Sequence, residues 1–148
     1  MEEILTFLKN HVYFSTLNDE EQKLFSNILS TETFKKDDIV FKQDDLGDRL
    51  YLVKEGLVRI YIIETSTDET IALMKPGDIF GELSLVDTQL RSANASVLAA
   101  STLLIITKEK FDELKNTNSQ IASKILQIML KVISKRLRLT TMKLYGQF

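Results

Sequence analysis

Apolar residues follow a helical spacing near the two ends of the chain and a two-residue spacing between them. Asn18 and Glu21 have the spacing of a helix N-cap and its third-position glutamate. They precede an apolar helical stripe formed by Leu24, Phe25, Ile28 and Leu29. From Thr31 onward the spacing changes to that of strands, so the pattern predicts helices over residues 1–30 and β-structure over residues 31–107.

Six segments in the middle of the chain have the length and composition of β-strands. They are Asp38–Lys42, Arg49–Lys54, Leu57–Thr65, Glu69–Met74, Ser92–Leu98 and Thr102–Thr107. Alternation is clearest at Val58, Ile60 and Ile62, and turn-forming residues such as Gly56 separate the segments. Short strands at this spacing predict a mainly β fold, an antiparallel sandwich or roll with flanking helices.

The C-terminal part predicts a short helix over Lys108–Leu114 and a long one that Asn118 caps and that reaches beyond Met142. One apolar stripe of the long helix is Ile121, Ile125, Ile128, Val132, Leu139 and Met142; the other is Leu126, Leu130, Ile133, Leu137 and Leu144. A helix that packs on one surface needs only one stripe. The second stripe favours a homodimer through the same helix of another subunit. The alternative is that both stripes are buried within one chain.

Composition is that of a globular protein. The chain has 148 residues, which fits one domain, with 44% hydrophobic and 27% charged residues. No apolar run approaches the roughly 20 residues of a membrane span, and the N-terminus has no signal-peptide pattern. The absence of cysteine excludes disulfides and thiol chemistry. We therefore expect a cytoplasmic protein that does not contact a membrane.

Residues 121–148 contain six Lys and Arg side chains and no acidic residue, within a chain of net charge −2. Such a segment either faces nucleic acid or complements the helix dipole and covers the solvent face of the helix. We favour the second interpretation, so DNA contact by this chain alone is not expected.

The sequence contains no residue pattern that indicates catalysis or metal binding. His11 is the only histidine and lies far from other candidate groups, so a surface or helix-packing role is expected for it. A metal enzyme on a β-roll would need several histidines or a carboxylate cluster. No nucleophile elbow, phosphate-binding Walker loop or paired-cysteine spacing is present. The sequence predicts a binding protein and not an enzyme, with no catalytic residue, no metal and no cofactor.

Residues 80–93 are the most informative segment for function. Gly81 and Glu82 lie just ahead of a short apolar turn of helix, and Arg91 follows nine residues after Glu82. These groups suit the binding of a cyclic nucleotide. A carboxylate accepts a hydrogen bond from the ribose 2′-OH, a guanidinium binds the phosphate, and backbone amides donate further hydrogen bonds to the anion. Taken alone, the same pair of charges is more often a solvated ion pair.

The segment resembles the phosphate-binding cassette of the cyclic nucleotide-binding domain family, which includes catabolite activator-type (CRP/FNR) regulators and kinase regulatory domains. The cassette reads Phe-Gly-Glu-Leu, a variable loop, then Arg-(Ala/Ser/Thr)-Ala, and the chain has Phe80–Leu83 and Arg91–Ala93. The resemblance implies that Glu82 holds the ribose and Arg91 the phosphate. It also implies that the cradle is lined by Gly81, Leu83, Ser84 and Ser92. Leu90 departs from the family, which often has proline there.

The resemblance also implies the fold, an antiparallel β-roll (a double-stranded, jelly-roll-like β-helix) between N-terminal helices and a long C-terminal helix. Gly47, Gly56 and Gly77 match family turns in which a tight bend needs φ > 0. Asp37 and Asp44 replace family glycines, so those two turns are expected to differ in detail.

Thr140 and Thr141 fall on a family pair that hydrogen-bonds the adenine amino group, one residue from each subunit. The resemblance thus favours cAMP as the ligand, with cGMP as the alternative, since Ser92 does not decide between them. The alternative is that Thr140 and Thr141 are two exposed β-branched residues near a fraying helix end, with no role in ligand binding.

The chain is therefore expected to be a single domain: helices over 1–30, a β-roll over 31–107 with the cassette at 80–93, and a short helix with a dimerisation helix over 108–148. No DNA-binding domain is expected, because the chain ends at Phe148. The predicted function is a cyclic nucleotide sensor that couples ligand binding to the C-terminal helix. The alternatives are a ligand-free dimerisation or docking module and the effector half of a longer transcription regulator.

Overall fold

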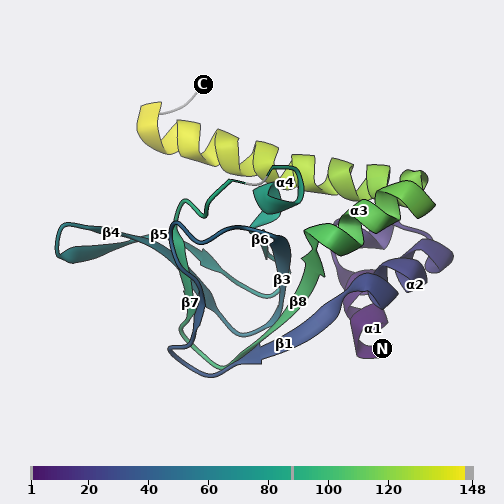
Figure 1. Ribbon diagram of the computed structural model, residues 1–148, viewed down its shortest axis with the longest axis horizontal. Helices are drawn as coiled ribbons and strands as arrows, with labels where there is room; N and C mark the ends of the chain where they lie inside the picture. Colours follow the sequence, from purple (N-terminus) through teal and green to yellow (C-terminus); the bar gives the residue numbers. More distant parts are fainter. Residues whose placement is uncertain (1, 88, 146–148) are drawn as a thin grey trace.

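Two four-stranded antiparallel sheets form the centre of the computed structural model, which describes residues 2–87 and 89–145 (Figure 1). The first sheet has the order β1 (Ser30–Phe34), β8 (Ser101–Thr107), β3 (Arg49–Glu55) and β6 (Ile79–Phe80). The second has the order β2 (Ile39–Phe41), β7 (Asn94–Val97), β4 (Val58–Glu64) and β5 (Thr67–Met74). The predicted antiparallel β-roll is confirmed.

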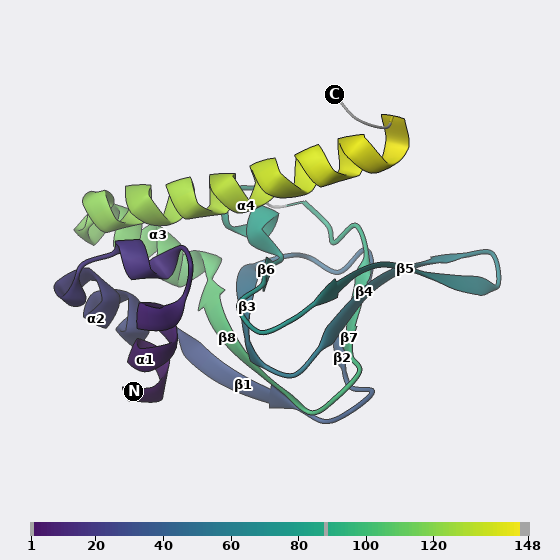
Figure 2. The ribbon, with the colours of Figure 1, turned by 180° about the vertical axis from the view of Figure 1, so that it is seen from behind.

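Helices surround one end and one side of the roll (Figures 1 and 2). They are α1 (Glu2–Asn10), the 3₁₀ turn η1 (Phe14–Thr16), α2 (Asp19–Ile28), the 3₁₀ turn η2 (Glu82–Leu85), α3 (Lys108–Thr117) and α4 (Ser119–Tyr145). The predicted cap of α2 is present, because Asn18 and Glu21 bond each other's backbone amides. Asn118 Oδ1 accepts the amide of Ile121 at 3.2 Å, as expected for the cap of α4.

Strands β3 and β8 are buried on both faces, which joins two cores. Leu52 and Leu104 face the cluster that includes the helices, while Val53 and Leu103 face the interior of the roll. Both strands therefore read as nearly continuous apolar runs. Sequence reasoning missed β1 and β6. Strand β1 is mostly exposed and has no apolar alternation, and β6 has only two residues.

Three turns share the pattern Lys-x-x-Asp, at residues 35–38, 42–45 and 75–78. In each, the Asp carboxylate accepts the Lys backbone amide, at 2.8, 2.9 and 2.8 Å. The third residue of each turn has a positive φ: 74° at Asp37, 71° at Asp44 and 95° at Gly77. The expectation that aspartate alters these turns is therefore wrong, because short Asx side chains tolerate the left-handed region.

Helix α4 is buried in its first half and exposed in its second. Its first stripe is buried as far as Val132, but Leu139 and Met142 are 49% and 46% exposed. The second stripe contains the exposed residues Leu130, Leu137 and Leu144, at 66%, 65% and 69%. The homodimer stays a prediction.

In the described residues no helix is both long and apolar enough to cross a membrane. Residues 146–148, which end the chain, lie outside the described residues.

Candidate ligand-binding site

A pocket of about 360 Å³ opens between the cassette segment, strands of both sheets and helix α4. Five predicted site residues line it: Gly81, Glu82, Ser84, Arg91 and Ser92. The remaining wall is largely apolar and comes from Phe41, Ile60, Met74, Phe80, Leu90 and Ala93, with Asp87, Gln89 and Arg136. The larger hollow of about 710 Å³ along the outer side of α4 contains no cassette residue. The pocket at the cassette is therefore the candidate site.

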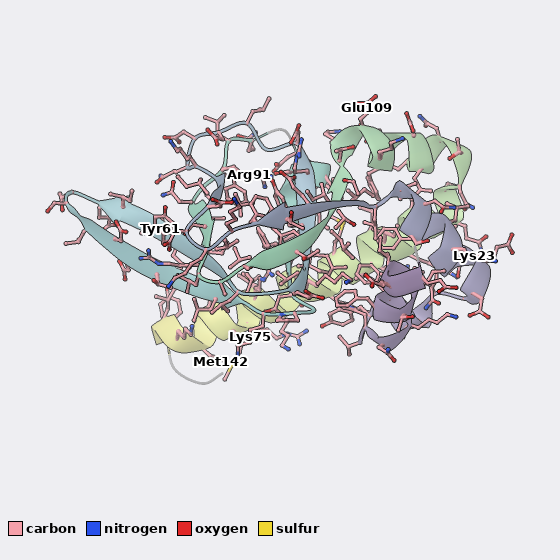
Figure 3. All side chains as sticks on the ribbon, turned by 90° about the horizontal axis from the view of Figure 1, so that it is seen from below. Lys23, Tyr61, Lys75, Arg91, Glu109 and Met142 are labelled. Carbon is pink, nitrogen blue, oxygen red and sulfur yellow. The ribbon has the colours of Figure 1, made fainter. Side chains whose placement is uncertain are left out.

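Arg91, labelled in Figure 3, lines this pocket and is buried, with 7% of its surface exposed. Its side chain donates to the carbonyl of Arg49 at 2.9 Å and to that of Gly81 at 3.4 Å. The guanidinium carbon lies 4.3 Å from the centre of the Phe41 ring and 5.8 Å from that of Tyr51. Among the described residues no carboxylate pairs with it. Burial lowers the pKa of Arg91, because the charged form loses hydration that an anion would replace.

Two glycines let the backbone approach Arg91 closely. A Cβ on Gly81 would lie 2.7 Å from Arg91 Nη1, and this residue has a φ of 73°. A Cβ on Gly47 would lie 2.2 Å from Ser84 Oγ and 3.2 Å from the Arg91 guanidinium carbon. The expected positive φ at Gly47 is wrong. This glycine is required by close packing against the cassette and not by turn geometry.

Glu82 is paired with a residue that sequence reasoning did not assign to the site. Its carboxylate accepts a hydrogen bond from Arg136 Nη1 on α4 at 2.5 Å. Arg136 Nη2 also donates to the carbonyl of Ile79 and lies 3.7 Å from Met74 Sδ. Glu82 is only 7% exposed, whereas the Arg136 side chain is 34% exposed, so the carboxylate is buried and the guanidinium stays partly in contact with water. The pair closes one side of the pocket with a charge from the helix.

The sequence does carry a signal for Arg136. The first apolar stripe of α4 runs through Val132 and Leu139, and Arg136 occupies the helical position between them. A charged residue that interrupts an apolar stripe must find a buried partner or solvent. The number of basic residues in segment 121–148 does not indicate that Arg136 has a buried partner.

Two predicted site residues, Thr140 and Thr141, do not line the pocket, and a third, Leu83, cannot be placed relative to it. Leu83 lies in η2, and its side chain is outside the described part of the chain. Thr140 and Thr141 lie on α4 one turn beyond Arg136, and neither lines the pocket. Thr141 Oγ1 donates to the carbonyl of Leu137 within the helix at 2.8 Å. Their contact with a ligand stays a prediction.

Residues 31–118 match the sequence profile described as "Cyclic nucleotide-binding domain". The chain belongs to this family. It is 35% identical over 105 residues to the "Cyclic AMP receptor protein" of Thermus thermophilus, covering 70% of this chain and 49% of that protein. It is 29% identical over 119 residues to a cGMP-dependent protein kinase of Drosophila melanogaster, covering 78% of this chain and 13% of the kinase.

The solved structures agree on the fold. A cyclic nucleotide-binding domain of Methylobacillus flagellatus has a TM-score of 0.85 at 24% identity, covering 96% of this chain and 80% of that one. The chain spans about half the length, or less, of the curated relatives named above. The family is one of regulatory binding domains, and some belong to kinases, so the absence of catalysis by this chain stays a prediction.

Proposed function

We propose that this chain is a cAMP sensor domain in which Arg91 binds the cyclic phosphate and Glu82 the ribose 2′-OH. The observation that carries the proposal is the state of Arg91. It is buried beside two aromatic rings, its hydrogen bonds go to backbone carbonyls, and it has no carboxylate partner among the described residues. A buried cation of this kind is prepared for a small anion in a pocket that combines an apolar wall with a few polar groups.

The contact between Glu82 and Arg136 supports coupling to α4. A ribose hydroxyl that donates to Glu82 approaches the carboxylate that Arg136 now binds. The helix and the ligand therefore share one acceptor group. Ligand binding then shifts the equilibrium between two positions of α4. The size of the shift is set by the difference in affinity for the nucleotide between these two arrangements.

The dimer is supported by the spacing on α4. Leu126, Leu130, Ile133, Leu137, Thr140 and Leu144 alternate steps of four and three residues, as in the seam of a coiled coil. Leu130, Leu137 and Leu144 are each about two thirds exposed in the single chain. We infer that a second copy covers them. Thr140 falls on the same seam, where a residue at the two-fold axis serves both subunits.

The preference for cAMP rests on two observations. The name of the Thermus relative specifies cyclic AMP, whereas that of the Drosophila relative specifies cGMP. Thr140 and Thr141 offer hydroxyl groups to the adenine amino group if the second subunit brings them to the base.

Calorimetric titration with cAMP, cGMP and 2′-deoxy-cAMP tests the function. We expect cAMP to bind more tightly than either of the other two ligands. Absence of binding by all three would overturn the proposal. It would favour the alternative in which Arg136 permanently satisfies Glu82 and the domain serves only for dimerisation or docking.

Sedimentation tests the dimer separately. Leu137→Asp places a charge on the proposed seam and should give monomers, while Val12→Asp changes an exposed apolar residue (74%) away from it and should leave the dimer intact. A wild-type protein that is monomeric at tens of micromolar contradicts the dimer but not the nucleotide site. Whether the domain acts alone or within a longer regulator is decided by the coding sequence that follows residue 148.

A further inference from the structure

The single histidine of the chain joins the N-terminal segment to the turn that leads into the cassette. His11 follows α1 and is 6% exposed. Its Nε2 lies 2.7 Å from the carbonyl oxygen of Gly77, in the turn between β5 and β6. Its Nδ1 lies 3.1 Å from the amide nitrogen of Tyr13 and 3.2 Å from that of Phe14. Both ring nitrogens are therefore engaged with backbone groups.

These contacts fix the protonation state of the ring. A carbonyl oxygen can only accept, so Nε2 carries a hydrogen. The two backbone amides can only donate, so Nδ1 is bare. The ring is thus neutral, with its proton on Nε2. A proton on Nδ1 would face two N–H groups and break both bonds.

Few charged groups surround the ring. Segment 11–14 contributes Tyr13, whose ring centre lies 6.0 Å from that of His11, and the turn contributes Asp78. Helix α1 contributes the uncharged Phe7 and Asn10 to the hollow beside the ring. Lys135 and Arg136 of α4 line the neighbouring hollow with Asp78. Burial lowers the pKa of His11, and the bond to Gly77 and the charge of Asp78 oppose this in part.

The clamped turn lies close in sequence to the ribose end of the pocket. Gly77 and Asp78 also exchange backbone bonds with Val53, at 2.8 and 3.0 Å. The next residue, Ile79, offers the carbonyl that Arg136 binds. Glu82 follows three positions later. A turn that loosens at Gly77 therefore shifts both groups that hold Arg136.

We propose that His11 is a positioning residue for the nucleotide site, which its neutral ring keeps in shape by clamping the β5–β6 turn, so that acid weakens nucleotide binding. The inference rests on the proposed function. The clamped form binds fewer protons than the released form, so a fall in pH favours release. The affinity for cAMP should fall by about threefold or more between pH 7.5 and pH 5.5.

Two variants separate the parts of the clamp. His11→Gln keeps an N–H that can reach Gly77 and does not titrate in this range, so its affinity for cAMP should be close to that of the wild type at pH 7.5 and nearly independent of pH. His11→Asn keeps an acceptor for the amides of Tyr13 and Phe14 but is too short to reach Gly77. It should bind cAMP at both pH values about as weakly as the acidified wild type.

The control variant is Val12→Ala, which changes the exposed neighbour of His11 and should retain the wild-type pH profile. Ring nitrogen shifts of the one histidine, measured by NMR without ligand, should show the Nε2–H tautomer at neutral pH, and the amides of Gly77 and Ile79 should shift as the ring titrates. These shifts do not depend on nucleotide binding.

The outcomes are distinct. A pH profile for cAMP binding that is the same in the wild type and His11→Gln overturns the positioning role and leaves the proposed function standing. No binding of cAMP at pH 7.5 overturns both. Two NMR results would overturn the clamp itself, whatever the affinities of the variants. One is an Nδ1–H tautomer, and the other is that the amide shifts of Gly77 and Ile79 do not change as His11 titrates.

Discussion

The two ends of the pocket are built in different ways. The phosphate end is made within the roll, where Arg91 bonds the carbonyls of Arg49 and Gly81 and lies against Phe41. The ribose end depends on α4, because Glu82 pairs with Arg136 from 54 residues further along the chain. The first end is therefore fixed whenever the roll is folded, while the second depends on where the helix lies. Under the proposed function, this division separates the binding of the ligand from the transmission of the signal to α4.

The largest effect is expected at the phosphate end. Arg91→Ala removes the buried pocket cation that has no carboxylate partner among the described residues, and the loss of such a partner for the phosphate costs about 2–5 kcal/mol. The affinity for cAMP should fall by about thirtyfold or more, as measured by calorimetry.

A matched control for Arg91 is Arg59→Ala. Arg59 also lies over an aromatic ring, that of Tyr61, with the guanidinium carbon 4.3 Å from the ring centre, but it is outside the pocket. The Arg59→Ala variant should retain the wild-type affinity for cAMP. Equal losses in both variants would indicate that the stability of the roll, and not the phosphate contact, had been measured.

A smaller effect is expected for Glu82→Gln at the ribose end. An amide oxygen still accepts the ribose hydroxyl, but a hydrogen bond to a neutral acceptor is weaker than one to a charged group by about 1 kcal/mol. The affinity for cAMP should fall by about fivefold. The ratio between cAMP and 2′-deoxy-cAMP should also narrow. An unchanged ratio would mean that Glu82 does not contact the ribose.

The cassette residues of the pocket could be predicted from the sequence, whereas the pairing of Arg136 with Glu82 could not. Gly81, Glu82, Ser84 and Arg91 fall within one short motif, so their order along the chain already describes their grouping. The pairing of Arg136 with Glu82 depends on where a helix crosses the roll, and tertiary packing decides that. The same limit applies to β6, whose two residues become a strand only through pairing with β3.

Arg136→Ala should change transmission more than affinity. Without the guanidinium, Glu82 is free for the ribose and α4 loses its bond to the ligand site, so the affinity for cAMP should change by less than about tenfold. In the wild type, cAMP should alter amide exchange in both 81–86 and 137–144. In the variant, the change should be confined to 81–86.

Lys135→Ala is the control for Arg136, because this neighbouring cation lines other hollows and not the ligand pocket. It should behave as the wild type. A ligand-dependent change in 137–144 that survives in Arg136→Ala would show that the helix receives the signal by another contact, and the comparison between the two ends would then lose its basis.

The smallest effect is expected in the turns that support the two ends. The turn at 42–45 bonds the backbone of Arg91, through Asp44 at 2.9 Å and Asp45 at 2.8 Å, while the turn at 75–78 leads to the ribose end. Asp44 and Gly77 hold equivalent positions with φ of 71° and 95°. Replacing aspartate by glycine relieves left-handed strain but raises the entropy of the unfolded chain, and the reverse exchange does the opposite, so the two effects on stability partly cancel.

Asp44→Gly and Gly77→Asp should therefore each change the free energy of unfolding by less than about 1 kcal/mol, as measured by urea denaturation. A Cβ on Gly77 meets only the His11 ring, at an ordinary 3.9 Å. Gly77→Val is the contrasting variant, because a β-branched residue is a genuine outlier at positive φ and should cost about 2 kcal/mol or more. If Gly77→Asp is as damaging as Gly77→Val, the turn at the ribose end tolerates only glycine. The two ends would then differ in their supporting turns as well as in the hydrogen-bond partners of their charged residues.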